Sequence, residues 1–305
     1  MQRRAVERSM STAFHTVPRS FEDSREELQR SLSRLNEARL QPRTEGIPLP
    51  LSEEMEIRQA ELSWLESECA DIAASAALAP SDEESFIQWF EQLRETGPGQ
   101  NDPLFPWLAQ KATFDEMAWF LSQEVAGEAG FDDLVALTQL RLPVRAKLEL
   151  ARNYWDEMGR GRESGMHGPM LDRLAADLRL SARRHEATWE SVSLGNLLMG
   201  LAANRGYAYH SVGALGVVEL TAPSRAVQVA AGLERLGVSV KSRRYYVLHA
   251  TLDVRHSAAW NEEVIRPLVR EDPTTARSIA EGALMRLTAG ARCFERYRRE
   301  LGVPS

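Results

Sequence analysis

Apolar residues recur at helical spacing through almost the whole chain after residue 50, and this pattern restricts the fold more than any other feature. The segments that show it are 52–78, 82–95, 106–128, 131–141, 143–159, 167–185, 187–204, 207–232, 239–266 and 273–301. Candidate capping residues precede two of them, Ser81 before an acidic run and Asp272 before Pro273. No segment alternates apolar and polar residues for long enough to require a β-sheet. The sequence therefore predicts an all-α domain.

The first 50 residues have a different organisation. Residues 1–20 carry Arg, Ser and Thr with little periodicity, which predicts a loosely attached arm. Residues 21–40 place three leucines at helical spacing, which predicts an amphipathic helix packed on the main domain or on a partner subunit. Residues 41–50 contain prolines and a glycine and are typical of a linker. We therefore divide the chain into an N-terminal arm, helix and linker (1–50) and a helical domain (51–305).

Composition excludes several classes of function. The net charge of −7 and the pI near 5.6 argue against nucleic acid as the main partner. No apolar run is long enough for a membrane span, and no apolar stretch follows the basic N-terminus as in a secretory signal. Cys69 and Cys293 are too few for a disulfide framework. A cytoplasmic protein with neither nucleic acid nor membrane as partner is the expectation.

Residues 249–256, with the sequence HATLDVRH, place three potential metal ligands on one predicted helix. His249, Asp253 and His256 stand at positions i, i+4 and i+7, which share one helix face. Two imidazoles and a carboxylate suit a metal that takes nitrogen and oxygen ligands, such as iron, manganese or zinc. On this stretch alone, a solvated or hydrogen-bonded face is an equally good interpretation.

A second candidate pair flanks a glycine-rich segment. Glu157 ends one predicted helix, His167 opens the next, and three glycines lie between them. Glycine breaks a helix, so the two side chains can converge without sharing a helix face. An ordinary turn with an exposed acid is the alternative, and the pair by itself favours that alternative.

Two further carboxylates interrupt apolar stretches. Glu219 lies in ALGVVEL, where a buried acid would be costly unless it were paired or bound to a cation. Glu124 follows WFLSQ in the same manner, and Glu128, one turn further on, is its rival for the same role. An acid at a solvent-exposed helix edge is the alternative in each case.

Taken together, the candidate ligands are Glu124, Glu157, His167, Glu219, His249, Asp253 and His256. Their four carboxylates balance the charge of two divalent ions and leave coordination positions open. This set favours a dinuclear iron or manganese site over a zinc site, which four ligands would saturate. A ferritin-like fold is disfavoured because it needs Glu-x-x-His on two helices, and this chain has only Asp253-x-x-His256.

The spacing of these residues resembles that of the haem-oxygenase-like diiron oxidases, also described as iron-containing redox enzymes. Glu157 lies 33 positions after Glu124, His167 a further 10 positions on, and His249 lies 30 positions after Glu219. The contexts FLSQE, FDDL, NYWDEMGRG, MHGPM and ALGVVE are also similar to the family. The resemblance covers roughly residues 100–270 and implies a haem-oxygenase-like helical bundle, here with an N-terminal helical extension.

The resemblance further implies that the seven residues hold two iron ions rather than haem, with manganese as the alternative metal and O2 as co-substrate. The implied activity is N-oxygenation or oxidative C–C cleavage of a small amine or amino-acid-derived metabolite in specialised metabolism. An external electron donor and a homodimer are both compatible with it. Three alternatives stay open: a fatty-acid-type oxidative decarboxylase, a metal-free oxidase like the quinone-cofactor biosynthesis branch, and a non-enzymatic metal-binding helical protein.

A few other residues invite a role but have a simpler explanation. Tyr207, Tyr209 and His210 lie before Glu219 and could line a pocket, although ordinary core and surface positions are favoured. Arg255 is expected to point outward from the ligand-bearing helix. The side chains of Trp119, Trp155 and Trp260 are expected to fill the core.

Overall fold

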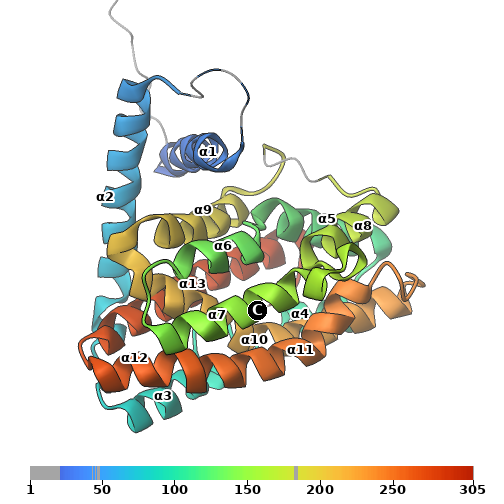
Figure 1. The fold of residues 1–305 in the computed structure, drawn as a ribbon. Coiled ribbons are helices and arrows are strands. Elements are labelled where there is room, and N and C mark those ends of the chain that lie inside the picture. The colour runs from blue at the N-terminus through green and yellow to red at the C-terminus, as the bar shows by residue number, and fades with distance from the viewer. Residues whose placement is uncertain (1–20, 43, 45, 47–48, 182–184, 305) are drawn as a thin grey trace, which may run out of the picture.

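The computed structural model describes residues 21–304 except 43, 45, 47, 48 and 182–184, so the predicted arm 1–20 lies outside the described residues. The described residues contain thirteen α-helices and no strand, as the sequence predicts. Their bounds are α1 Phe21–Leu40, α2 Leu51–Ala76, α3 Glu83–Thr96, α4 Leu104–Gln110, α5 Phe114–Gly127, α6 Phe131–Thr138, α7 Val144–Glu157, α8 His167–Leu178, α9 Trp189–Ala203, α10 Ala208–Arg235, α11 Arg244–Trp260, α12 Arg266–Glu271 and α13 Thr275–Leu301. Figure 1 shows their arrangement as a bundle.

Helix α10 lies in the middle of the bundle and packs against α13, α11 and α4. Glycines let α10 and α13 approach closely. A Cβ atom at Gly213 would lie 1.9 Å from the carbonyl oxygen of Ile279, and one at Gly282 would lie 1.8 Å from that of His210. Any larger side chain at either position would therefore push the two helices apart.

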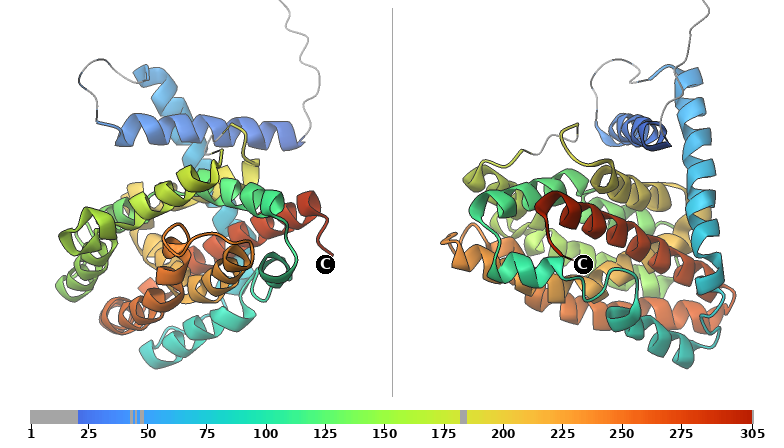
Figure 2. Two further views of the ribbon diagram at one scale, coloured as in Figure 1. Left: turned by 90° about the vertical axis from the view of Figure 1, so that its right-hand side faces the viewer. Right: turned by 180° about the vertical axis from the view of Figure 1, so that it is seen from behind.

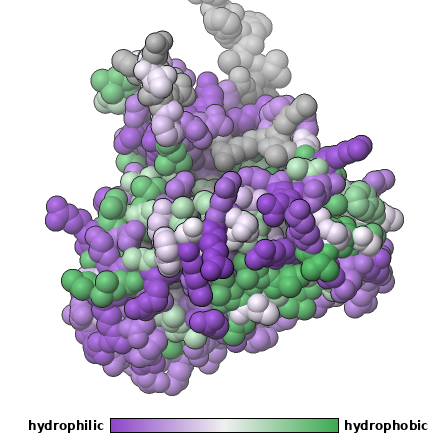
Figure 3. All heavy atoms as spheres, turned by 45° about the vertical axis from the view of Figure 1, so that its right-hand side comes forward, coloured by the Kyte–Doolittle hydropathy of each residue, from purple (hydrophilic) through white to green (hydrophobic). Residues whose placement is uncertain are grey.

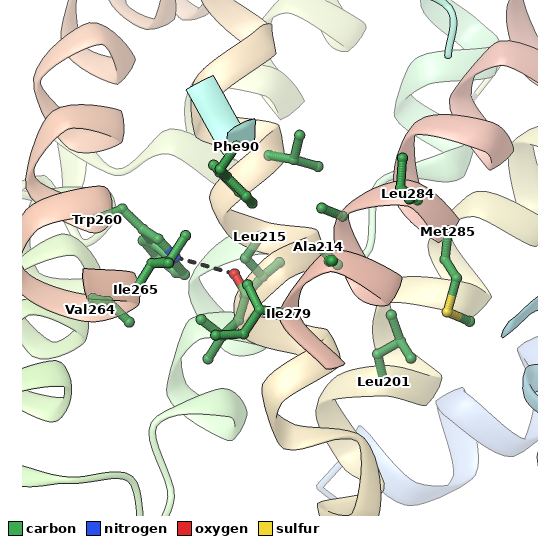
Figure 4. Close-up of a cluster of buried hydrophobic side chains, with 14 of the residues drawn as sticks. Phe90, Leu201, Ala214, Leu215, Trp260, Val264, Ile265, Ile279, Leu284 and Met285 are labelled. Atoms are coloured by element: carbon green, nitrogen blue, oxygen red, sulfur yellow. Dashed lines mark hydrogen bonds between the residues drawn. The ribbon is translucent and has the colours of Figure 1, made fainter. Parts of the chain in front are cut away.

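The largest core cluster surrounds Trp260, which is only 1% exposed. Its indole Nε1 donates a hydrogen bond of 3.2 Å to the carbonyl oxygen of Val212 on α10. Phe90, Leu215 and Ile279 pack around it, so three helices meet at one aromatic side chain (Figure 4). The indole is thus both buried and hydrogen-bonded, as a stable core position for tryptophan requires.

Helix α1 packs on the main bundle, which is one of the two positions expected from the sequence. It lies across α9 and beside α2 (Figure 2). Leu32 and Leu35 are fully buried, and Asn36 Nδ2 donates a hydrogen bond of 2.8 Å to Asn196 Oδ1 on α9. The separate domain boundary at residue 50 stays a prediction.

Several predicted helices have different bounds in the structure, and α8, predicted over 167–185, already ends at Leu178. The segment 106–128 is two helices, because the chain turns at residues 111–113 and α5 starts anew with a capping box between Thr113 and Glu116. The segment 239–266 ends later than predicted: a π-helical turn at Asn261–Ile265 continues α11 directly into α12. This wider turn carries the chain past Pro267, which lacks the N–H that an α-helix would require there.

The predicted caps and one predicted core residue also need correction. Asp82, not Ser81, caps α3 by accepting a hydrogen bond of 2.9 Å from the Ser85 N–H. Thr274 is the N-cap residue of α13, and Asp272 accepts the Thr274 N–H in the preceding turn. Trp155 is 52% exposed and not part of the core, because it lies on the outer face of α7 and covers Gly161.

None of the described helices combines the length and apolar character that crossing a bilayer would need. On the face shown in Figure 3, hydrophilic side chains are interspersed with hydrophobic ones.

Candidate metal centre

Helix α11 carries three candidate ligands, of which two are buried and the third is half-buried. Asp253 and His256 are 3% and 7% exposed, and His249 lines the same internal cavity as Asp253. The intervening Val254 and Arg255 are exposed, which also confirms the outward position expected for Arg255. The structure therefore places the three predicted side chains on one inward face, as their spacing requires.

Glu157 and His167 converge across the glycine-rich segment. Glu157 is the last residue of α7 and His167 the first of α8, and both are buried. Gly159 has φ +60° and its Cβ would lie 2.3 Å from the backbone of Gly165, so the two ends of this loop touch through bare backbone. The loop thereby brings His167 Nδ1 to 2.6 Å from Glu157 Oε2.

Glu219 joins these residues from α10. It is 2% exposed, and its Oε1 accepts a hydrogen bond of 2.6 Å from Asn153 Nδ2 and lies 3.4 Å from His256 Nδ1. The opposite nitrogen of His256, Nε2, lies 3.2 Å from Asp156 Oδ2. Asn153 and Asp156 were not predicted from the sequence, although they lie four residues and one residue before Glu157 on the last turns of α7.

The candidate ligands form two groups that share one residue. The first contains Glu157, His167 and His249, and the second contains Glu157, Glu219 and His256. In each group, one potential ligand atom per residue lies within 4.8 Å of the others. Because a carboxylate has two oxygens, Glu157 can face two adjacent cations at once.

Asp253 belongs to neither group but lies beside both. Burial, followed by the charges of Glu219 and Glu157, raises the pKa of Asp253 to about 10. Burial and the charge of Glu219 likewise raise the pKa of Glu157 well above its ordinary value. Three carboxyl groups in one buried space repel one another when ionised, and cations would relieve this repulsion.

The histidines differ in their protonation. Burial and the charge of a neighbouring histidine lower the pKa of His167 and of His249 to about 4, so both are neutral at pH 7, the form that binds metals. Burial alone would lower the pKa of His256, but the carboxylates of Glu219 and Asp156 outweigh it and raise that pKa to about 9. In the metal-free protein His256 is therefore a buried cation between two acids.

Unpaired buried atoms show that this donor set fits metal ions. His167 Nδ1, His256 Nδ1 and Asp253 Oδ1 are buried and have no hydrogen-bond partner among the described residues. His167 Nδ1 is near Glu157 Oε2, but the direction of its N–H does not meet the oxygen. Buried polar atoms normally have partners, and imidazole nitrogens and carboxylate oxygens are ligands suited to iron or manganese.

Glu124 and Glu128 both line the cavity, and neither belongs to the two ligand groups. The charges that add to burial in raising the pKa of Glu157 are those of Glu219, Asp132 and Glu128. Burial also raises the pKa of Glu124, whose charged neighbours are Arg225, Arg286 and Glu128. The charges of Glu128 and of Asp132, at the start of α6, therefore act on a residue of the ligand groups. The predicted ligand role of Glu124 stays a prediction.

A cavity of about 200 Å³ is lined by all of the candidate ligands except His256. Ligand-bearing side chains line one part, and apolar side chains such as Phe105, Phe120 and Phe294 line another. Water has limited access past such a wall, which suits a site for a reactive metal centre.

A third cluster of potential ligands lies elsewhere, where Cys69, His210 and Glu281 meet. His210 Nε2 lies 3.1 Å from Glu281 Oε2, and Arg277 Nε donates to Glu281 Oε1 at 2.5 Å, while His210 Nδ1 is buried without a hydrogen-bond partner among the described residues. Tyr207 packs its ring on His210, outside the cavity wall. These positions agree with the ordinary structural role that the sequence favours for Tyr207 and His210.

Comparison with solved structures establishes the class of fold. A CADD-like protein of unknown function from Nostoc punctiforme is 18% identical, and the match covers 70% of this chain and 95% of that one with a TM-score of 0.54. A domain of unknown function with a heme oxygenase-like fold from Shewanella denitrificans is 17% identical over 79% of this chain and 94% of its own, with a TM-score of 0.51. The protein thus has a haem-oxygenase-like fold with an N-terminal helical extension. No curated protein matches the sequence.

The family follows from the sequence itself. The model of the iron-containing redox enzyme family matches residues 118–291, which is more than half of the chain and includes all seven candidate ligands. The chain belongs to the iron-containing redox enzyme family.

Proposed function

We propose that this protein is a non-haem diiron enzyme that activates O2 and oxidises a small amine or amino-acid-derived metabolite. The observation that carries the proposal is the pair of ligand groups that share Glu157. A single ion would leave one of the two groups, with its buried carboxylate and imidazole, without a cation. Membership of an iron-containing redox family supports iron as the metal.

In this proposal, two ions would share Glu157 as a ligand. His167 and His249 would hold one ion, and Glu219 and His256 would hold the other. Asp253, on which the charges of Glu219 and Glu157 act, would supply a further carboxylate. Two ferrous ions held there would supply electrons for the activation of O2.

For two of the three histidines, neighbouring groups determine which nitrogen would face the metals. His249 Nδ1 donates to the Tyr245 carbonyl oxygen at 2.7 Å, which leaves Nε2 as the ligand atom. Asp156 holds Nε2 of His256, which leaves Nδ1 toward Glu219. Asn153 holds Glu219 by its Oε1. These contacts orient the ligands before a metal arrives, so less ordering is required on binding.

The chain also determines where protons reside. The pKa of Asp253, raised to about 10, means that this carboxyl group keeps its proton in the metal-free protein at neutral pH, and burial shifts the pKa of Glu157 in the same direction. The proton of Asp253 must leave when its oxygens become ligands. The apolar wall then keeps bulk water away from the oxidising centre.

The proposal is tested by anaerobic loading with Fe(II) followed by O2. We expect a transient absorbing species and O2 uptake that depends on substrate in an amine and amino-acid panel. Glu219→Ala and His256→Ala should lose two-metal loading while keeping their helical circular dichroism. His185→Ala, on an exposed residue, is the matched control.

Each alternative gives a different result in the same experiment. A metal-free oxidase would keep full activity after rigorous chelation. A metal-binding protein without catalysis would take up iron and consume no O2 on any panel. An oxidative decarboxylase would respond to fatty acids and not to amines or amino acids.

A further inference from the structure

Two arginines line the metal-site cavity away from the ligand groups. Arg225 extends from α10 and Arg286 from α13, and both are part of the cavity wall. Arginine is seldom placed in a largely apolar wall unless an acid partner compensates it. These two side chains therefore require an explanation that the metal site does not provide.

Arg225 is held firmly in place. Its Nε donates a hydrogen bond of 3.2 Å to the Thr221 carbonyl oxygen, and its Nη2 donates to Thr221 Oγ1. Its guanidinium lies 5.3 Å from the ring centre of Phe294 and 5.9 Å from that of Phe105. Such stacking keeps the plane of the guanidinium fixed, so its remaining donors point in a defined direction.

Arg286 lacks the partners that a buried guanidinium needs. Its Nε and Nη1 are buried and make no hydrogen bond to any described residue. A Cβ atom at Gly290 would lie 2.6 Å from Nη1, so the absence of a side chain there makes room for the guanidinium. Donors that are charged, buried and unpaired are costly, and an anionic ligand would satisfy them.

The acids nearby do not fully compensate this positive charge. Glu124 is the carboxylate whose charge acts on both arginines, yet it forms no ion pair with either of them among the described residues. Glu128 also acts on Arg286, but its Oε1 accepts the backbone N–H groups of Ala129 and Gly130 at 3.1 and 3.0 Å. Burial, followed by the charge of Arg286, lowers the pKa of Arg225 to about 9, as expected for two neighbouring cations.

The position of the arginines relative to the ligand groups limits the size of an occupant. Arg225 follows Glu219 by six residues on α10, a rise of about 9 Å along the helix. The cavity of about 200 Å³ is smaller than the pockets of about 300–1,000 Å³ that hold drug-sized ligands. A small molecule bound at the arginines could therefore extend its other end to the ligand groups.

We propose that Arg225 and Arg286 bind the carboxylate of the substrate and that the enzyme acts on a small carboxylate-bearing metabolite whose opposite end faces the metal ligands. This inference rests on the proposed function and adds the charge and orientation of the substrate to it. An amino-acid-derived metabolite has this carboxylate, whereas a simple amine lacks it.

The test measures binding to the metal-free full-length protein, where no metal can capture the carboxylate. Acetate, butyrate, hexanoate and L-norleucine are each compared with the corresponding primary amide by isothermal titration calorimetry. We expect at least one carboxylate to bind about 10- to 100-fold more tightly than its amide, as for hydrogen bonds to a charged group. Equal affinity for acid and amide, or no saturable binding of any of these acids, would overturn the proposal.

Arginine variants locate the binding site. Arg286→Met and Arg225→Met should each lose the preference for the acid, and Arg286→Lys should keep part of it because it retains the charge. Arg255→Met, on the exposed face of α11, should bind like the wild type. Identical binding by Arg286→Met and Arg255→Met would refute the assignment, and circular dichroism checks that each variant folds.

The outcome can be separated from that of the proposed function. Carboxylate binding that persists in a protein without iron-dependent O2 uptake would remove the oxidase and keep the anion site. Normal iron loading and O2 uptake without any preference for the acid over the amide would keep the oxidase and remove the anion site.

Discussion

The two halves of α10 lie in opposite surroundings. Around Val212–Gly216 the helix is close-packed: a Cβ atom at Gly216 would lie 2.7 Å from Trp260 Nε1, and Gly213 touches the backbone of α13. From Glu219 to Val229 the same helix lines a cavity with charged side chains. Pro223 lies within this second part and cannot donate to the Glu219 carbonyl, so a helical hydrogen bond is missing along the cavity wall. The close-packed part therefore stabilises the fold, whereas the part that lines the cavity places charged side chains at the candidate site.

The largest effect should come from the close-packed half. Trp260→Ala removes a fully buried side chain and its hydrogen bond, and we expect it to lower the free energy of unfolding by about 3–5 kcal/mol. Urea unfolding followed by circular dichroism measures this loss. Trp155→Ala, at an exposed tryptophan, is the control. If Trp260→Ala lowered the free energy of unfolding by less than Trp155→Ala does, the difference between the two parts of α10 would be contradicted.

Asp253→Asn should raise the free energy of unfolding of the metal-free protein, whereas Trp260→Ala lowers it. Because the folded state raises the pKa of Asp253 from 3.8 to about 10, it holds a proton that the unfolded chain releases. The stability of the metal-free protein therefore falls as pH rises between these values, and asparagine removes this fall. We expect a gain of about 1–3 kcal/mol at pH 8 together with weaker metal binding. A loss of stability at pH 8 would show that the carboxylate has a structural partner.

Metal binding should release protons, because Glu157, Asp253 and His256 all have raised pKa values in the metal-free protein. The apparent affinity for Mn(II) should rise about tenfold per pH unit for each proton released. Calorimetry in buffers with different ionisation enthalpies measures the number of protons. Asp253 and His256 both hold a proton between pH 6.5 and 8, because their pKa values lie above this range. An affinity for Mn(II) that does not change with pH in this range would contradict their role as ligands.

The smallest effect should come from the outer face of α11. Arg255→Met should change stability by less than about 0.5 kcal/mol and leave metal binding unaltered, since the residue is exposed. Metal titration of this variant beside His256→Ala compares two faces of one helix. A metal-binding defect in Arg255→Met would mean that the outward face takes part in the site.

Local patterns in the sequence predicted much of this site. The spacing of His249, Asp253 and His256 defines a helix face, and the glycines between Glu157 and His167 allow those two side chains to meet. Each of these patterns lies within a short stretch of the sequence, residues 249–256 or 157–167, so it can be read from the sequence without knowing the fold.

What could not be predicted depends on contacts between distant segments. Asn153 and Asp156 gain their roles only from Glu219 and His256 on other helices. Arg225 and Arg286 occur in amphipathic helices, where arginine usually faces solvent. Glu124 satisfies the spacing of a ligand, but its position relative to Arg225 and Arg286 is set by how α5, α10 and α13 pack.

The central claim is that Glu157 joins two metal positions, and an anaerobic Mn(II) titration followed by electron paramagnetic resonance tests it most directly. We predict two Mn(II) ions per chain with an exchange-coupled spectrum, and loss of the coupling with at most one ion in Glu157→Ala. A single uncoupled ion in the wild type, or an unchanged coupled pair in Glu157→Ala, would contradict the account.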